Sequence, residues 1–196
     1  MDDLSEDLTE DLTGDRASAR TGGPATLPLL VRPMTLADCE RVSEIRVRGW
    51  QHAYRGLMPQ PYLDALSVAR DAERRRERFG TGDGPVVNLV AERAGGTVGW
   101  AAVGPYRDDE GGTTADAELY AIYVDPAHLG SGVGRALLAE SLGRCSGASR
   151  LLLWVLRENT RARRFYERAG FRPDGAEEPF DVDGVEVPEV RYARQL

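Results

Sequence analysis

The stretch from Leu119 to Leu138, LYAIYVDPAHLGSGVGRALL, constrains this chain more than any other. It begins with β-favouring residues, is interrupted at Asp125-Pro126, passes through three glycines and continues with apolar residues at helical spacing. The pattern predicts a strand, a glycine loop and a helix. Such a loop directs backbone N–H groups outward at the positive end of a helix dipole, and glycine permits a close approach. We interpret it as a pyrophosphate-binding loop; a plain strand-to-helix turn is the alternative.

Two common nucleotide-binding loops do not match this stretch. A Walker loop requires Lys and then Ser or Thr after its last glycine, but Gly134 is followed by Arg135 and Ala136. A Rossmann loop requires G-x-G-x-x-G, with an acidic residue about 20 residues further on, and the spacing here is G-x-G-x-G. The segment Leu129–Gly134 resembles the acetyl-coenzyme A loop of the GNAT superfamily of acetyltransferases, in which Gln or Arg usually stands where this chain has Leu129.

Length and charge limit the remaining possibilities. The 196 residues suit one domain, which we place at 27–196, preceded by a leader at 1–26. The leader carries seven acidic residues and two arginines, and we expect it to be a disordered, solvated tail. The net charge of −7 argues against nucleic acid as a partner. No apolar run is long enough for a membrane span, and no signal peptide begins the chain, so we expect a cytoplasmic protein.

The first half of the chain reads as one strand, three helices and a hairpin. We expect a strand at 29–31, helices at 36–53, 60–66 and 68–79, and a hairpin of strands at 86–92 and 97–103. Arg74, Arg75, Arg76 and Arg78 in the third helix are interpreted as a solvated face. Cys39 and Cys145 are expected to be reduced and buried, and the two histidines lie too far apart to suggest a metal site.

The second half predicts a parallel pair of strands. A polar loop at 105–115 leads to a strand at 117–124, and the apolar run RLLLWVL at 150–156 is typical of a strand buried on both faces. Because the glycine loop and its helix connect these strands, they form a right-handed βαβ unit. A helix capped by Asn159 or Thr160 and a final strand at 189–194 complete an α/β layered fold around a mixed sheet.

A second motif makes the GNAT resemblance specific. The helix ENTRARRFYERAGF is similar to the family pattern N-x-x-A-x-x-F-Y-x-x-x-G-F, matched by Asn159, Ala162, Phe165, Tyr166, Gly170 and Phe171. It follows the glycine loop after one strand, as in the family, and the resemblance covers roughly residues 28–196. It implies a mixed sheet flanked by helices, with acetyl-coenzyme A bound between two parallel strands that splay apart, and transfer of its acetyl group to an amine.

The resemblance also implies which residues hold the cofactor. Backbone groups of Ile122 and Val124 would pair with the pantetheine arm, and an N–H near Tyr123 would stabilise the oxyanion. Asn159 would bond the pantetheine, on the helix face that also carries Ala162. The loop residues assigned to the pyrophosphate and its surroundings are Leu129, Gly130, Ser131, Gly132, Val133, Gly134 and Arg135.

Two residues are candidates for the proton transfers. The attacking amine must be neutral, and Glu118 stands where many GNAT enzymes place their base; the alternative is a carboxylate on the rim of the site. Tyr166 matches the family's general acid, which would protonate the leaving thiolate. The alternative for Tyr166 is a core aromatic residue.

The acceptor site is the least determined part of the prediction. The family builds it from the first helices and the loop after the third strand, which nominates Trp50, His52, Tyr54, Tyr62 and Tyr106. These aromatic residues suit an apolar or cationic amine, and they are equally consistent with simple packing. We expect an enzyme that acetylates a small-molecule amine in a ternary complex, and a homodimer is possible for this family. A protein N-terminal acetyltransferase and a non-catalytic acyl-coenzyme A sensor are the alternatives.

Overall fold

The computed structural model describes residues 28–81, 84–107 and 113–196, so the expected leader at 1–26 lies outside the described residues. Seven strands form one sheet in the order β1-β2-β3-β4-β5-β7-β6. The strands are β1 (Leu29–Pro33), β2 (Val87–Arg93), β3 (Gly96–Arg107), β4 (Thr113–Val124), β5 (Arg150–Leu156), β6 (Arg172–Val182) and β7 (Val185–Gln195). The helices are η1 (Leu36–Asp38), α1 (Cys39–Ala53), α2 (Gln60–Ala65), α3 (Val68–Thr81), η2 (Pro126–His128), α4 (Val133–Arg144) and α5 (Thr160–Arg168).

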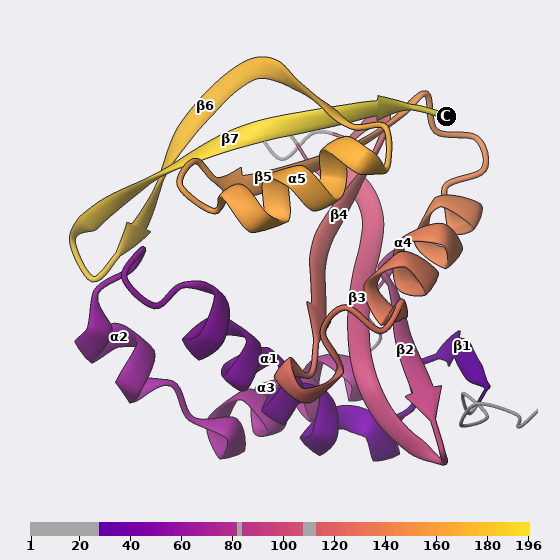
Figure 1. The fold of residues 1–196 in the computed structure, drawn as a ribbon. Helices are drawn as coiled ribbons and strands as arrows, with labels where there is room; N and C mark the ends of the chain where they lie inside the picture. The colour runs from indigo at the N-terminus through magenta and orange to yellow at the C-terminus, as the bar shows by residue number, and fades with distance from the viewer. Residues whose placement is uncertain (1–27, 82–83, 108–112) are drawn as a thin grey trace, which may run out of the picture.

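Helices cover both faces of the sheet. In Figure 1, α1–α3 lie on one side of strands β2–β4 and α4 lies on the other. The main core lies on the α4 face of the sheet, where Leu137 of α4 and Tyr166 of α5 pack with Leu151 and Leu153 of β5. Fully burying a leucine side chain stabilises the fold by about 2 kcal/mol. The opposite face holds two smaller clusters, one around Trp100 and one around Trp50.

The β4–β5 pair is the parallel pair of the sheet, and it is very short. Ala117 pairs with Leu151 and Glu118 pairs with Leu152, after which the two strands continue without pairing to Val124 and Leu156. All the other neighbouring strands are antiparallel. Figure 1 shows the result: β2–β4 run down the view while β5–β7 cross its top. The expected splay is therefore present, and it exposes unpaired backbone groups along one edge of β4.

The structure agrees with the predicted order of elements and corrects some boundaries. β3 extends to Arg107 and β4 begins at Thr113, so most of the expected loop at 105–115 belongs to strands. The final hairpin is also longer than expected, because β7 begins at Val185 and not at 189. A β-bulge near Tyr120 shifts the register between β3 and β4. The polar residues Thr113, Thr114 and Asp116 concealed the start of the strand, since β-pairing depends more on neighbours than on local composition.

Two smaller expectations can be compared with the structure. Cys39 and Cys145 are both buried, and neither forms a disulfide within the residues that the structure describes. Arg75 contradicts the interpretation of its helix face as solvated, because only 7% of it is exposed. Within the residues that the structure describes, no helix is both long and apolar enough to cross a membrane.

Candidate active site

The glycine loop begins where β4 ends. Asp125 accepts a hydrogen bond from the Ala127 N–H at 2.9 Å and is bound by Arg41 of α1, which fixes the start of the loop. Gly130 has φ 77° and Gly132 has φ 90°, a left-handed backbone conformation that favours glycine. A Cβ atom at Gly130 would meet nothing within 4 Å, so this glycine is required by its conformation and leaves open space beside the loop.

Helix α4 presents unsatisfied N–H groups to that space. Its cap residue is Gly132, and the Ala136 N–H donates to the Gly132 carbonyl oxygen at 3.1 Å. The N–H groups of Val133, Gly134 and Arg135 therefore precede the first bond of the helix. Together with the helix dipole they suit an anion, so the loop has the geometry of a pyrophosphate site.

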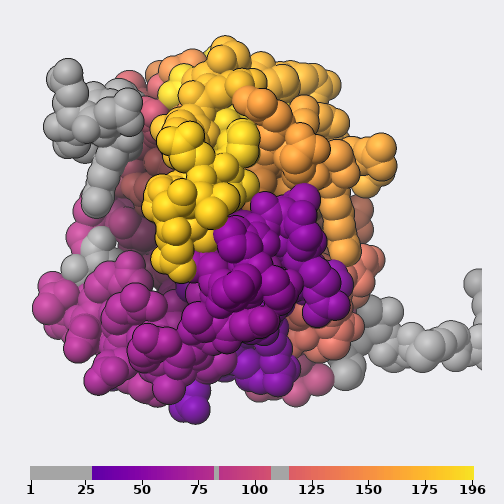
Figure 2. All heavy atoms as spheres, turned by 90° about the vertical axis from the view of Figure 1, so that its left-hand side faces the viewer, coloured from indigo at the N-terminus to yellow at the C-terminus, as the bar shows by residue number. Residues whose placement is uncertain are grey.

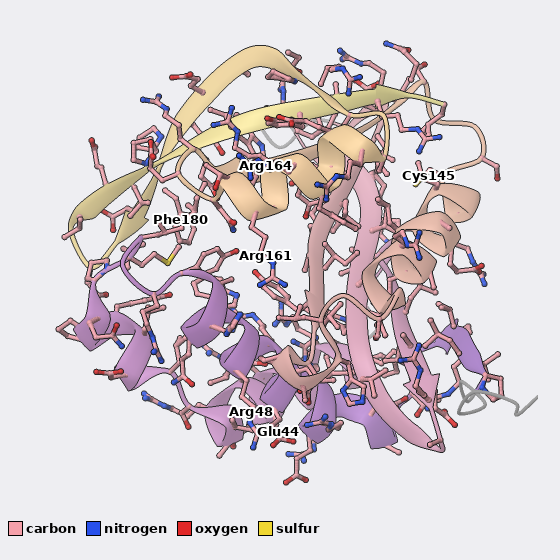
Figure 3. All side chains as sticks on the ribbon, viewed as in Figure 1. Glu44, Arg48, Cys145, Arg161, Arg164 and Phe180 are labelled. Atoms are coloured by element: carbon pink, nitrogen blue, oxygen red, sulfur yellow. The ribbon has the colours of Figure 1, made fainter. Side chains whose placement is uncertain are left out.

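Helix α5 lies on the same side of the splay as α4, and both helices pack into the main core. Its N-cap is Asn159, whose Oδ1 accepts a hydrogen bond from the Ala162 N–H at 3.1 Å. The amide Oδ1 of Asn159 is thus used locally, which leaves its Nδ2 group for the predicted bond to a pantetheine. Arg161, labelled in Figure 3, extends from α5 toward α1, where its Nη1 lies 3.4 Å from Nε2 of His52.

These features fit coenzyme A. Alternate residues of β4 beyond Glu118 direct their backbone groups into the splay, because β3 occupies the other edge of the strand. An extended pantetheine arm can pair there as an added strand. The side chains of Ile122 and Val124 pack into the main core, so their contribution to such pairing comes from the backbone.

Three tyrosines meet across the splay. The hydroxyl groups of Tyr54 and Tyr123 lie 3.1 Å apart on the α1 side, and Tyr166 approaches from α5 on the other side. Burial raises the pKa of Tyr166, and interaction with Tyr123 adds to the rise. Burial likewise raises the pKa of both Tyr54 and Tyr123. All three phenols therefore keep their protons at neutral pH, as a proton donor must.

Tyr166 has the surroundings of a core residue and a hydroxyl that the core does not use. Its ring makes edge contacts with Phe165 at 5.2 Å and Phe171 at 5.9 Å. Among the described residues, its hydroxyl makes no hydrogen bond. The hydroxyl can therefore bond to a ligand while the ring packs in the core. The packing is compatible with Tyr166 as a general acid and with Tyr166 as a core aromatic residue.

The predicted acceptor residues fall into three groups. Trp50, Tyr54 and Tyr62 lie together, with the Trp50 ring 5.1 Å from Tyr54 and 6.2 Å from Tyr62. His52 is exposed at the end of α1. Tyr106 lies elsewhere on the same face of the sheet, and its hydroxyl accepts a hydrogen bond from Arg191 at 2.9 Å.

A cavity of about 890 Å³ opens on this acceptor side, between α1, α3 and the sheet. Asp71, which is buried, binds both Arg46 at 2.8 Å and Arg75 at 3.2 Å, and these guanidinium groups lie over the rings of Trp50 and Trp100. The lining residues are Met34, Arg46, Trp50, Asp71, Arg74, Arg75, Glu77, Arg78, Phe79, Val86, Asn88, Trp100, Ala102, Tyr120, Ala121 and Tyr123. Arg74 and Arg78 of α3 thus line the cavity as well as facing solvent.

Glu118 and Glu189 are carboxylates on the acceptor face of the sheet. Glu118 occupies the last paired step of β4 and β5. Glu189 of β7, which the sequence analysis did not single out, is half-buried opposite Leu156. Burial, followed by the charge of Glu178, raises the pKa of Glu189 to about 7. Its only sequence signal is a charge within the alternating pattern of a strand, which is too common to identify a site.

Comparison with known proteins agrees with this geometry. Residues 47–171 match the model of the acetyltransferase (GNAT) family. The chain is 31% identical to the uncharacterized N-acetyltransferase YuaI of Bacillus subtilis over 82% of this chain and 89% of that protein. A mycothiol acetyltransferase of Thermobispora bispora is 38% identical over 44% of this chain and 30% of its own length.

Solved structures share the fold. The yncA protein of Salmonella typhimurium, solved with acetyl-coenzyme A, has a TM-score of 0.64 and 23% identity, over 86% of this chain and 94% of its own. A splayed parallel pair with an anion-binding loop at its end defines a class of acyl-coenzyme A-dependent transferases. The chain belongs to the GNAT acetyltransferase family. It is an acetyltransferase, and acetyl-coenzyme A is its cosubstrate.

Proposed function

We propose that this protein transfers the acetyl group of acetyl-coenzyme A to the primary amine of a small molecule, by direct attack in a ternary complex. The observation that carries the proposal is the splay, which has an anion-binding loop at one end and the three tyrosines across it. Acetyl-coenzyme A supplies an activated thioester when bound. Both substrates can reach the splay at once, the donor along β4 and the acceptor from the α1 side.

Different residues of this chain bind the cofactor, stabilise the oxyanion and donate the proton. The β4 backbone binds the pantetheine, and the N–H groups at the start of α4 bind the pyrophosphate. A backbone N–H near Tyr123 stabilises the charge that develops on the carbonyl oxygen. Tyr166 donates a proton to the departing sulfur, because its raised pKa keeps the hydroxyl protonated until the thiolate forms.

The β6–β7 hairpin favours a small acceptor over a peptide. Val182 and Val187 of the hairpin pack against Trp50, Met58 and Leu63 of the α1–α2 region. In Figure 2 the yellow β7 segment lies directly against the purple first helices. A peptide acceptor needs an open groove beside the splay, and this contact leaves the β6–β7 hairpin packed on the α1–α2 region.

The cavity points to the chemistry of the acceptor. Asp71 is paired with Arg46 and Arg75, whereas Arg74 and Arg78 are exposed, one turn apart on α3, and pair with no acidic residue among those described. Glu77 offsets one of these two charges. The excess of positive charge favours an amine that also carries a carboxylate or phosphate, not the cationic acceptor that the aromatic residues suggested.

Calorimetry and a thiol-release assay test the proposed function. The protein should bind acetyl-coenzyme A and release coenzyme A when a suitable amine is present. The panel should contain matched amines with and without a carboxylate, and we expect faster release with the carboxylate. Binding without release for any amine would favour the sensor alternative, and release with peptide N-termini alone would favour the protein acetyltransferase.

A further inference from the structure

Glu189 of β7 is a half-buried carboxylate beside the end of β5. Glu189 pairs with Leu156 of β5 on one side and with Glu178 of β6 on the other. Residues directly opposite one another in a sheet share a face. Leu156 belongs to the cluster around Trp50, so Glu189 lies on the acceptor face of the sheet.

Glu189 lies near Tyr123 of β4, with which it interacts electrostatically. Glu118 pairs with Leu152, and beyond this pair the two strands separate, β4 continuing through Ile122 to Val124 and β5 to Leu156. Glu189 is the neighbour of Leu156 in the sheet. The family resemblance places the thioester carbonyl near Tyr123, beside Ile122. Glu118 lies four residues before Ile122 on β4, where β4 and β5 still pair, and about 13 Å from Ile122 along the strand at roughly 3.3 Å per residue.

The charged groups around Glu189 leave its carboxylate uncompensated. Arg191 shares its strand face, but that guanidinium binds Asp174 at 2.8 Å. Arg157, which follows β5, binds Glu177 of β6. No ion pair of Glu189 is present among the described residues.

Two phenols and one carboxylate among the described residues interact electrostatically with Glu189. Tyr54 at the end of α1 and Tyr123 on β4 both interact electrostatically with Glu189. Glu178, its neighbour on β6, carries the same charge. A partly buried carboxylate without a cation is costly to maintain, and such groups concentrate at functional sites.

We propose that Glu189 is the proton acceptor for the attacking amine, an inference that rests on the proposed acetyltransferase function. Glu189 takes one proton from the substrate ammonium group. The neutral nitrogen then forms a bond to the carbonyl carbon, the carbon–sulfur bond breaks, and its electron pair goes to sulfur. Tyr166 protonates the sulfur and recovers a proton from the new amide nitrogen. The net products are an N-acetylated amine, coenzyme A and one proton, which Glu189 releases to solvent.

The acidity of Glu189 suits this role. Burial and the charge of Glu178 raise the pKa of Glu189 to about 7. At neutral pH a large fraction of the Glu189 side chains is therefore ionised, and this carboxylate binds a proton more strongly than an ordinary one. General bases work best when their pKa lies near the working pH. A plot of the rate against pH should therefore have an acidic limb, a fall in rate below about pH 7, that results from protonation of Glu189.

The pH dependence of kcat/KM tests the inference. We expect Glu189→Gln to lower kcat at pH 7 by about 100-fold or more, to remove the acidic limb and to leave the affinity for acetyl-coenzyme A within about twofold of the parent. Glu189→Asp should retain part of the activity. Glu186→Gln, an exposed carboxylate on the same strand, is the matched control and should behave as the parent.

Two further variants separate the possibilities. Glu178→Gln removes the neighbouring charge, which lowers the pKa of Glu189, so the acidic limb should move to lower pH. In Glu118→Gln the limb should persist. The inference is overturned if Glu189→Gln keeps its rate and its limb, or if the limb disappears only in Glu118→Gln. Failure of the parent protein to release thiol with any amine would instead overturn the proposed function, and this inference with it.

Discussion

The two sides of the splay are built in different ways. The proposed cofactor side consists mainly of backbone groups on β4 and α4, which the continuous stretch from Leu119 to Leu138 supplies, with Asn159 of α5 beside them. The proposed acceptor side consists of side chains from α1, α3, β4 and β7, which lie far apart in the sequence. Backbone recognition tolerates changes in side chains but depends on conformation, whereas the acceptor side depends on the identity and position of each residue. Substitutions should therefore affect the two sides separately.

The largest effect should come from the loop conformation. Gly132→Val places a β-branched residue at φ 90°, where such residues are strongly disfavoured. We expect the affinity for acetyl-coenzyme A, measured by calorimetry, to fall at least about 100-fold, because the N–H groups at the start of α4 lose their common direction. Gly143→Ala, in the same helix with open space around it, is the matched control. It should bind normally and gain up to about 1 kcal/mol of stability.

A change at Tyr166 should separate catalysis from binding. Tyr166→Phe keeps the ring among Phe165 and Phe171 and removes the hydroxyl. We expect kcat to fall about 100-fold, with the affinity for acetyl-coenzyme A unchanged. Tyr192→Phe is the control, because the Tyr192 hydroxyl binds Arg163 and Glu167 within the core. That control should lose about 1 kcal/mol of stability and keep its turnover; an undiminished kcat in Tyr166→Phe would show that Tyr166 serves packing alone.

A substitution on α1 should disturb only the acceptor side. A Cβ atom at Gly49 would lie 2.9 Å from Cδ1 of Tyr123, so Gly49→Ala must displace that ring and its hydrogen bond to Tyr54. We expect the KM for the amine to rise several-fold while the Kd of acetyl-coenzyme A stays within twofold. Gly80→Ala, on α3 with no close neighbour, is the control. A loss of acetyl-coenzyme A binding in Gly49→Ala would mean that the two sides are coupled through β4.

The same contrast explains what the sequence could predict. The strand, loop and helix around Gly130–Gly134 and the cap at Asn159 are local patterns, and the structure contains them at the expected places. Which aromatic residues meet is not local: Trp50, Tyr54 and Tyr62 come together, but Tyr106 contacts Arg191 instead. Arg75 resembles its exposed neighbours in sequence and is buried only because Asp71 and Trp100 receive it. Glu189 gains its character from strand pairing across the sheet, which no short motif encodes.

The smallest expected effect concerns stability and pH at Glu189. Its pKa in the folded protein is about 7, above the ordinary value of 4.5, so the folded state binds more protons between these values. Stability attributable to this group therefore falls as the pH rises from 4.5 to 7. Full burial would make the cost ~1.4 kcal/mol per pKa unit, and solvent around the half-buried side chain reduces it to about 1–2 kcal/mol in total. Glu189→Gln should accordingly be more stable than the parent at pH 8 and nearly equal at pH 4 in thermal unfolding. Glu186→Gln should show no such difference between the two pH values. The same difference in both variants would mean that Glu189 is solvated in the folded protein, and that the acceptor side holds no carboxylate with a raised pKa.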